Sequence, residues 1–193
     1  LEATRGVNTH KGAIYSMGLV CGAAGRLWTD AGFPRDANAI LDECARLAAP
    51  TARRTLDDLC ETTAATAGER ACLRHGVRGV RGEAADGFPA VRNIALPALR
   101  AALSDGKTLE QAGAYVLLRL IADVSDTNLI ARGGPEGRQR AALRAMQLLA
   151  HKQGFDRDAL MRFDTEMVEK NLSPGGCADL LALTYLLHAV QAR

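Results

Sequence analysis

Apolar residues recur every three or four positions along almost the whole chain, which is the spacing of helices with one buried face. The strict alternation of apolar and polar residues that is typical of half-buried strands does not occur in the sequence. The pattern therefore predicts an all-α protein. Residues 1–193 should form a single multi-helix globular domain, with glycine-rich loops at the helix ends that form the functional site.

Prolines, glycines and capping residues set the expected helix boundaries. Pro50 should end a helix that begins at Pro34, and Pro97 should kink a later helix. Thr108 and Gln111 have the spacing of a capping box. The expected helices cover residues 9–28, 34–49, 53–74, 89–103, 108–124, 136–153, 156–171 and 180–192. The third of these helices has a weak point in its small residues around 62–68.

Three glycine-bearing segments between these helices are expected to be loops, namely residues 75–89, 125–135 and 172–179. A fourth special segment, residues 2–12, precedes the first helix. Loops held by a rigid scaffold often carry the residues that do chemistry. These four segments are therefore the places where functional side chains are expected.

The composition is that of an ordinary globular protein, with 48% hydrophobic and 24% charged residues. The formal net charge of +2 is too small to indicate a nucleic-acid partner, and no apolar stretch is long enough to indicate a membrane span. The five cysteines are odd in number and include no CxxC pair. We therefore expect mostly buried free thiols and a reducing, cytoplasmic location.

The segment 2–12, with the sequence EATRGVNTHKG, places a glycine, an amide, a hydroxyl, an imidazole and an ammonium just before a long apolar helix. Backbone N–H groups near Asn8 and Thr9 could bind an oligophosphate together with Lys11. His10 would then be a nearby donor or acid. Alternatively, Asn8 and Thr9 only cap the helix, and for this segment alone capping is the simpler explanation.

The segment 78–89, with the sequence RGVRGEAADGFP, combines glycines with arginines. Glycines beside Arg78 and Arg81 let guanidinium groups and backbone approach an anion together, and Glu83 could orient an arginine or bind a metal. A solvated loop with a local Arg–Glu pair explains the same residues equally well.

The segment 126–134, with the sequence DTNLIARGG, offers oxygen ligands. Asp126 and Asn128 are of the kind that Mg²⁺ accepts, and Arg132 precedes a Gly133-Gly134 pair. The alternative is that Asp126 caps a short turn that the two glycines end.

The segment 173–182, with the sequence SPGGCADLLA, is a glycine-rich helix start. N–H groups near Ser173 and Gly175 could bind an anion, and Asp179 could bind a metal. Alternatively, Ser173 caps the helix and Asp179 only interacts with its dipole. The four segments are harder to dismiss together than singly, and they suggest one polar site where several helix ends converge.

In this order, the segments 2–12, 78–89, 126–134 and 173–182 resemble the triphosphoribosyl-dephospho-CoA synthase family, over essentially the whole chain. The resemblance implies a transferase that joins the triphosphoribosyl group of ATP to the 2′-hydroxyl of 3′-dephospho-CoA and releases adenine, with Mg²⁺ as cofactor. The product would become the prosthetic group of the acyl carrier protein of citrate lyase or malonate decarboxylase. Family members normally carry a preceding helical segment, so we expect that this segment has been lost or is supplied by another chain.

The resemblance assigns the candidate residues to the tasks of this reaction. Contacts to substrate phosphates are expected from Asn8, Thr9, Lys11, Arg78, Arg81, Arg132, Gly133, Ser173 and Gly175. The expected Mg²⁺ ligands are Asp126, Asn128 and Asp179. The expected catalytic residues are Glu83 as a base or metal ligand, His10 as an acid or donor, and Asp126.

Two other functions stay open on the sequence. A Mg²⁺-dependent helical hydrolase of nucleotide or ribosyl bonds would use the same carboxylates, with water as the acceptor. A catalytically silent helical module would bind a carrier protein or another subunit. A homodimer is an arrangement that the sequence neither requires nor excludes.

Overall fold

The computed structural model describes residues 10–30, 32–33, 35–64, 66–151 and 155–191 of the 193-residue chain. Within these ranges every regular element is a helix, and the only extended pairing is an isolated bridge between Thr29 and Gly32. The expectation of an all-α fold is therefore confirmed. The elements are α1 (Lys11–Arg26), α2 (Ala37–Asp57), α3 (Ala67–His75), α4 (Gly79–Ala85), the π-helical η1 (Val91–Ala95), α5 (Leu96–Ser104), α6 (Leu109–Asp123), α7 (Thr127–Leu149), α8 (Arg157–Glu169) and α9 (Gly175–Gln191).

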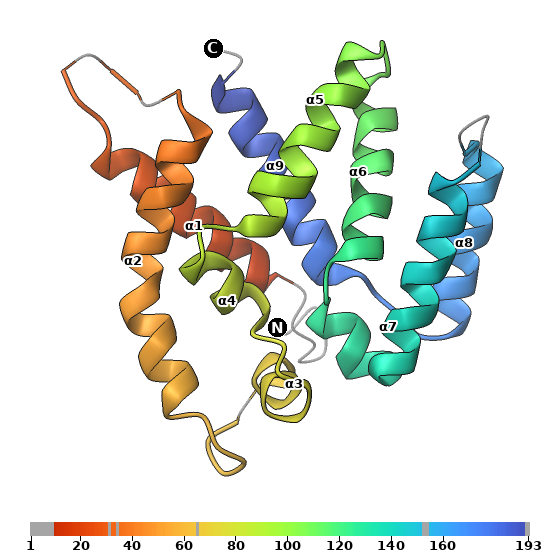
Figure 1. Ribbon diagram of the computed structural model, residues 1–193, viewed down its shortest axis with the longest axis horizontal. Coiled ribbons are helices and arrows are strands. Elements are labelled where there is room, and N and C mark those ends of the chain that lie inside the picture. Colours follow the sequence, from red (N-terminus) through yellow and green to blue (C-terminus); the bar gives the residue numbers. More distant parts are fainter. Residues whose placement is uncertain (1–9, 31, 34, 65, 152–154, 192–193) are drawn as a thin grey trace.

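Helix α9 crosses the middle of the molecule, with α1 and α2 on one side and α6 to α8 on the other (Figure 1). It contacts α1, α2, α6, α7 and η1. Its sequence is apolar on nearly every face, which suits a helix surrounded by other helices. The chain thus wraps around its own last helix, and the N-terminal end of α9 is brought close to elements from the whole sequence.

Helix α2 continues through Pro50 to Asp57, so the expectation that Pro50 ends the helix was wrong. Ala48 and Ala52 are both buried on either side of the proline. Because this packing favours a continuous helix, it outweighs the loss of one backbone hydrogen bond at Pro50.

The third expected helix, over residues 53–74, is divided in the structure. Its first residues belong to α2, and α3 begins only at Ala67. Thr66 and Glu69 form a capping box there, in which each side chain accepts the backbone N–H of the other residue. The weak point expected around 62–68 is therefore a break between two helices.

Residues 75–89 are not the continuous loop that the glycines suggest, because they contain α4. Gly79 and Gly87 have φ angles of +57° and +72°, which place a turn before and after this short helix. Gly82 and Ala84 are buried on it, and α4 packs against α2. Burial of small residues against α2 stabilises a helix that local sequence does not favour.

The expected loop 125–135 is also largely helical. Asp126 is the N-cap residue of α7, which begins at Thr127. The helix is interrupted only at Gly134, whose φ and ψ are 66° and −175°. The expected kink at Pro97 is taken up by the π-helical turn η1 just before it, where the Leu96 N–H donates to the Val91 carbonyl. The capping box of Thr108 and Gln111 is present at the start of α6.

The cysteines are all free thiols, but they are less buried than the sequence suggests. Cys44 and Cys177 are buried and Cys72 is intermediate, whereas Cys21 and Cys60 are exposed. Cys21 lies on the outer side of α1, whose buried face carries Ser16, Val20, Ala23 and Ala24 instead. The apolar composition of this helix therefore does not show which of its faces is buried.

Candidate functional site

A cavity of about 660 Å³ lies where the first turns of α1, α3, α7 and α9 approach α4. We call it the four-motif cavity, because residues from all four special segments line it. Its charged side chains are Lys11, Arg78 and Arg81, and Glu69, Glu83, Asp86, Asp126 and Asp179. Figure 1 shows that these helix ends come from the two halves of the sequence.

Asp126 lies at the centre of this arrangement, with 2% of its surface exposed. Its Oδ1 accepts the backbone N–H groups of Asn128, at 2.7 Å, and Leu129, at 3.3 Å, which caps α7. Its Oδ2 accepts the N–H of Cys177, at 2.9 Å, in the first turn of α9. One carboxylate therefore joins the N-termini of two helices that are about 50 residues apart in sequence.

The approach of α9 to this carboxylate depends on small residues. A Cβ atom added at Gly176 would lie 3.1 Å from Asp126 Oδ2, and one added at Gly175 would lie 2.6 Å from Asn128 Nδ2. Gly175 itself lines neither this cavity nor the second one described below. The glycines of this segment are thus required for close packing of α9 on α7.

Asp179 lies one turn further along α9 and faces the first turn of α1. Its carboxylate packs directly on Gly12, where an added Cβ would collide with Oδ2. Burial raises the pKa of Asp179, nearby Asp126 raises it further, and His10 lowers it. His10, at the N-cap position of α1, is therefore close enough to Asp179 for their charges to interact.

Glu83 is a half-buried carboxyl on α4. Burial raises its pKa, while a hydrogen bond that it accepts from the Ala90 backbone N–H, at 3.1 Å, acts in the opposite direction. The negative charge of Asp86 raises the pKa of Glu83 further. A carboxyl with a raised pKa is a better proton acceptor than an ordinary one.

Arg81 on α4 and Arg78 at its N-cap each form an ion pair with a carboxylate. Arg81 Nη1 donates to Glu69 Oε1 at 2.6 Å, and Arg78 forms an ion pair with Asp86. Because a guanidinium has five N–H donors, each arginine keeps donors for a further anion. The pairs fix the arginines at the edge of the cavity.

Glu69, Asp86 and Tyr15 are among the residues of this cavity that were not predicted as site residues from the sequence. Glu69 and Asp86 orient the arginines, and Tyr15 lines the cavity from α1. Burial raises the pKa of the Tyr15 hydroxyl, although the charge of Arg81 opposes the shift. The capping box of Glu69 is visible in the sequence, but nothing local shows that Tyr15 faces the cavity.

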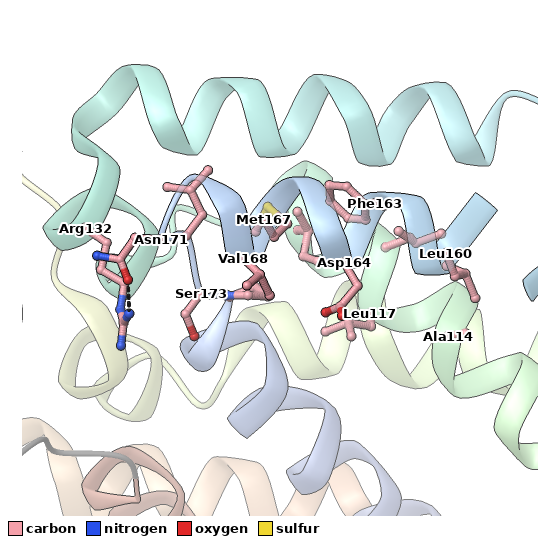
Figure 2. Close-up of a pocket in the computed structure, with 14 residues that line it drawn as sticks. Ala114, Leu117, Arg132, Leu160, Phe163, Asp164, Met167, Val168, Asn171 and Ser173 are labelled. Atoms are coloured by element: carbon pink, nitrogen blue, oxygen red, sulfur yellow. Dashed lines mark hydrogen bonds between the residues drawn. The ribbon is translucent and has the colours of Figure 1, made fainter. Parts of the chain in front are cut away.

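The remaining candidates lie elsewhere. Arg132 and Ser173 line a second cavity, shown in Figure 2, and Arg132 Nη1 donates to Asn171 Oδ1 at 2.9 Å. Gly133 lines neither cavity, because its Cα faces the side chain of Leu172, which an added Cβ would hit. Asn8 and Thr9 are outside the described residues.

Comparison with known proteins agrees with the resemblance seen in the sequence. The profile of a protein family described as CitG, ATP:dephospho-CoA triphosphoribosyl transferase, matches residues 1–193. The chain belongs to the ATP:dephospho-CoA triphosphoribosyl transferase family. The predicted family is therefore confirmed.

Relatives in this family include a 2-(5''-triphosphoribosyl)-3'-dephosphocoenzyme-A synthase of Pectobacterium atrosepticum, which is 46% identical over 97% of this chain and 61% of its own length. A protein provisionally given the same name in Vibrio cholerae is 43% identical over 96% of this chain and 60% of its own length. The chain thus spans about three fifths of the length of these relatives.

A crystal structure from Archaeoglobus fulgidus, provisionally named a triphosphoribosyl-dephospho-CoA synthase, has the same fold. It superposes with a TM-score of 0.63 at 18% sequence identity, covering 94% of this chain and 81% of that chain.

None of the described helices combines the length and apolarity needed to cross a bilayer.

Proposed function

We propose that this chain forms the site of a transferase that joins the triphosphoribosyl group of ATP to the 2′-hydroxyl of 3′-dephospho-CoA and releases adenine. The observation that carries the proposal is the meeting of all four family segments in one cavity, where acids, bases and cations lie together. The product would be the precursor of the prosthetic group of an acyl carrier protein.

Helix N-termini supply the attraction for the triphosphate. The first turns of α1, α3, α7 and α9 line the four-motif cavity, and each helix start brings a partial positive charge to it. Lys11, Arg78 and Arg81 add three full charges. An oligophosphate is the part of ATP that this combination fits.

The donor set also fits a magnesium ion. Among the described residues, five acidic and three cationic side chains line the cavity, so these side chains alone do not compensate a triphosphate. Asp179 is a half-buried carboxyl beside Asp126, and together with Asn128 these residues offer oxygen ligands. No cluster of three or more His, Cys, Asp or Glu side chains suited to a metal occurs among the described residues. Mg²⁺ commonly takes only one or two carboxylates together with substrate phosphates. When bound, Mg²⁺ would neutralise phosphate charge.

Glu83 is the proposed base. It takes the proton of the acceptor 2′-hydroxyl while a new bond forms between that oxygen and C1′ of the ATP ribose. The bond between C1′ and N9 of adenine breaks, and adenine leaves with a proton that His10 supplies. The developing positive charge on the sugar resembles that of glycoside transfer, and the carboxylates around the cavity would stabilise it.

Mass spectrometry tests this reaction directly. The chain is incubated with ATP, Mg²⁺ and dephospho-CoA, both alone and with the additional segment that the longer relatives carry. We expect dephospho-CoA to gain a triphosphoribosyl group, with one adenine released for each product. Adenine release that does not depend on dephospho-CoA would favour the hydrolase instead. Failure to bind ATP in both mixtures would favour the silent module.

A further inference from the structure

The second cavity, of about 600 Å³, lies between α6, α8 and the connection from α8 to α9. We call it the α6–α8 cavity. Its walls are mostly apolar, with Leu117, Phe163 and Met167 among them, while Arg132, Asn171 and Ser173 lie together at one end (Figure 2). A site with one cationic, polar end and a long apolar interior fits a ligand with an anionic group at the start of a weakly polar chain.

The polar end of this cavity combines a backbone turn with a side-chain hydrogen bond. Asn171 has a φ angle of 51° and follows the last turn of α8, where the Leu172 N–H donates to the Met167 carbonyl at 2.8 Å. The side chain of this fixed residue accepts a hydrogen bond from Arg132. Arg132 is thereby held at the entrance with four further N–H donors for an anion.

The α6–α8 cavity adjoins the four-motif cavity. Asn128 lines the four-motif cavity and Arg132, one turn further along α7, lines the α6–α8 cavity. One turn of helix advances about 5.4 Å. At the start of α9 the lining changes in the same way between Pro174, just before the helix, and Gly176. The two cavities therefore come within about one helical turn of each other, which is close enough for the two ends of one elongated ligand to be bound in the two cavities.

We propose that the α6–α8 cavity binds the pantetheine arm of 3′-dephospho-CoA, an inference that rests on the proposed function. The acceptor carries, in order, the reacting 2′-hydroxyl, the ribose 5′-diphosphate and the pantetheine arm. The structure offers, in the same order, the proposed base Glu83, the guanidinium of Arg132 with Ser173, and the apolar interior. The order of chemical groups in the ligand matches the order of environments in the protein.

Asp164 favours pantetheine over a simple hydrocarbon chain. It lies among the apolar residues in the middle of the cavity, near Leu117 and Val168 (Figure 2). Its side chain is exposed. Its carboxylate can accept a hydrogen bond from an amide N–H or the hydroxyl of pantetheine, whereas a hydrocarbon chain offers no donor.

Binding of 4′-phosphopantetheine, measured by calorimetry, tests the assignment. Ala114→Phe places a ring in the cavity, and Arg132→Ala removes the cation at its entrance. Each should weaken binding of 4′-phosphopantetheine and dephospho-CoA about tenfold or more, while ATP affinity stays within about twofold. Ala131→Phe and Arg140→Ala are matched controls on α7, because both residues are exposed and line neither cavity. Circular dichroism confirms that each variant folds.

The outcomes separate this proposal from the proposed function. If neither variant changes the affinity for 4′-phosphopantetheine, or if the wild-type chain does not bind it, the assignment of the α6–α8 cavity is wrong. Dephospho-CoA-dependent adenine release by the wild type, with an unchanged KM in both variants, would overturn only the cavity assignment. If both variants lose 4′-phosphopantetheine binding but the wild type shows no dephospho-CoA-dependent adenine release, only the proposed transferase reaction would be overturned.

Discussion

At the scale of single residues, Asp126 combines a structural role with a place in the proposed site. Its two oxygens accept three backbone N–H groups from α7 and α9, and it lines the four-motif cavity at the same time. A carboxylate oxygen has two lone pairs, so these hydrogen bonds leave acceptor capacity for a metal. Loss of activity on substitution would therefore not by itself identify a metal ligand.

We expect Asp126→Ala to lower the free energy of unfolding by about 2–4 kcal/mol, because three N–H groups at two helix starts lose their acceptor. Asp126→Asn keeps an oxygen acceptor and should cost less. Urea unfolding measures both, with Glu136→Ala on the exposed part of α7 as a control that changes stability by less than about 0.5 kcal/mol. Equal stability of Asp126→Ala and wild type would contradict the two-helix cap.

Glu83 should give the reaction a distinctive pH dependence. A general base acts in its ionised form, and the pKa of Glu83 is raised by burial, so kcat/KM should rise with pH through a value above that of an ordinary glutamate. Glu83→Gln should lower kcat about 10²- to 10⁴-fold and remove this limb of the profile. Glu136→Gln is the control.

The stability of the same variant gives an independent check. Because the folded-state pKa of Glu83 is raised, the folded chain binds the proton more tightly than the unfolded chain. The stabilising effect of protonation is complete below the unfolded pKa and is lost as the pH rises through the folded pKa. Glu83→Gln should therefore be at least as stable as wild type at neutral pH, and a large loss of stability would indicate a structural role instead.

At the scale of helices, the sequence predicted helix starts correctly where a side chain caps the helix. It failed where packing against other helices determines whether a segment is helical. Thr108, Gln111 and Asp156 begin α6 and α8 where expected, because a cap involves only residues of one turn. The segment around Pro50 and the segment that forms α4 are both helical, although the local sequence predicts a helix end and a loop. The reason is that buried small residues pack against other helices in both places.

Two glycines of α1, Gly12 and Gly18, allow a test of the close contact between α1 and Asp179 of α9. Gly12→Ala would place a methyl group against the Asp179 carboxylate, whereas a methyl group at Gly18 meets nothing within 4 Å. We expect Gly12→Ala to destabilise the fold by about 1–3 kcal/mol and to weaken ATP binding, since the half-buried Asp179 carboxylate must shift to make room for the methyl group. Gly18→Ala should stabilise it by about 0.4–1 kcal/mol. Thermal unfolding measures both, and equal effects of the two changes would contradict the contact between Gly12 and Asp179.

At the scale of the whole molecule, the fold brings helix N-termini and acidic side chains into one cavity. The helix ends favour an anion, whereas the carboxyl groups of the described lining residues oppose one. In the proposed function, a divalent cation bound with the phosphates would resolve this conflict, since it would bring positive charge to the carboxylates and the triphosphate together.

ATP binding should therefore require Mg²⁺. Calorimetric titration with ATP should give an affinity at least about tenfold lower in the presence of a chelator than with Mg²⁺ in excess. Asp179→Asn should reduce this difference, because it removes one of the carboxylates that oppose free ATP. The same affinity for ATP with and without the chelator would show that the cations and helix ends suffice.

The sequence by itself determined the kind of element, the family and the four polar segments, because periodicity, capping and motif order are properties of neighbouring residues. Only the tertiary structure decided that Lys11, Glu83, Asp126 and Asp179 share one cavity while Arg132 and Ser173 belong to another. It also decided that Gly133 and Gly175 serve close packing. The physical reason is that these placements depend on contacts between helices far apart in sequence, above all the packing of α9 between the two halves of the chain.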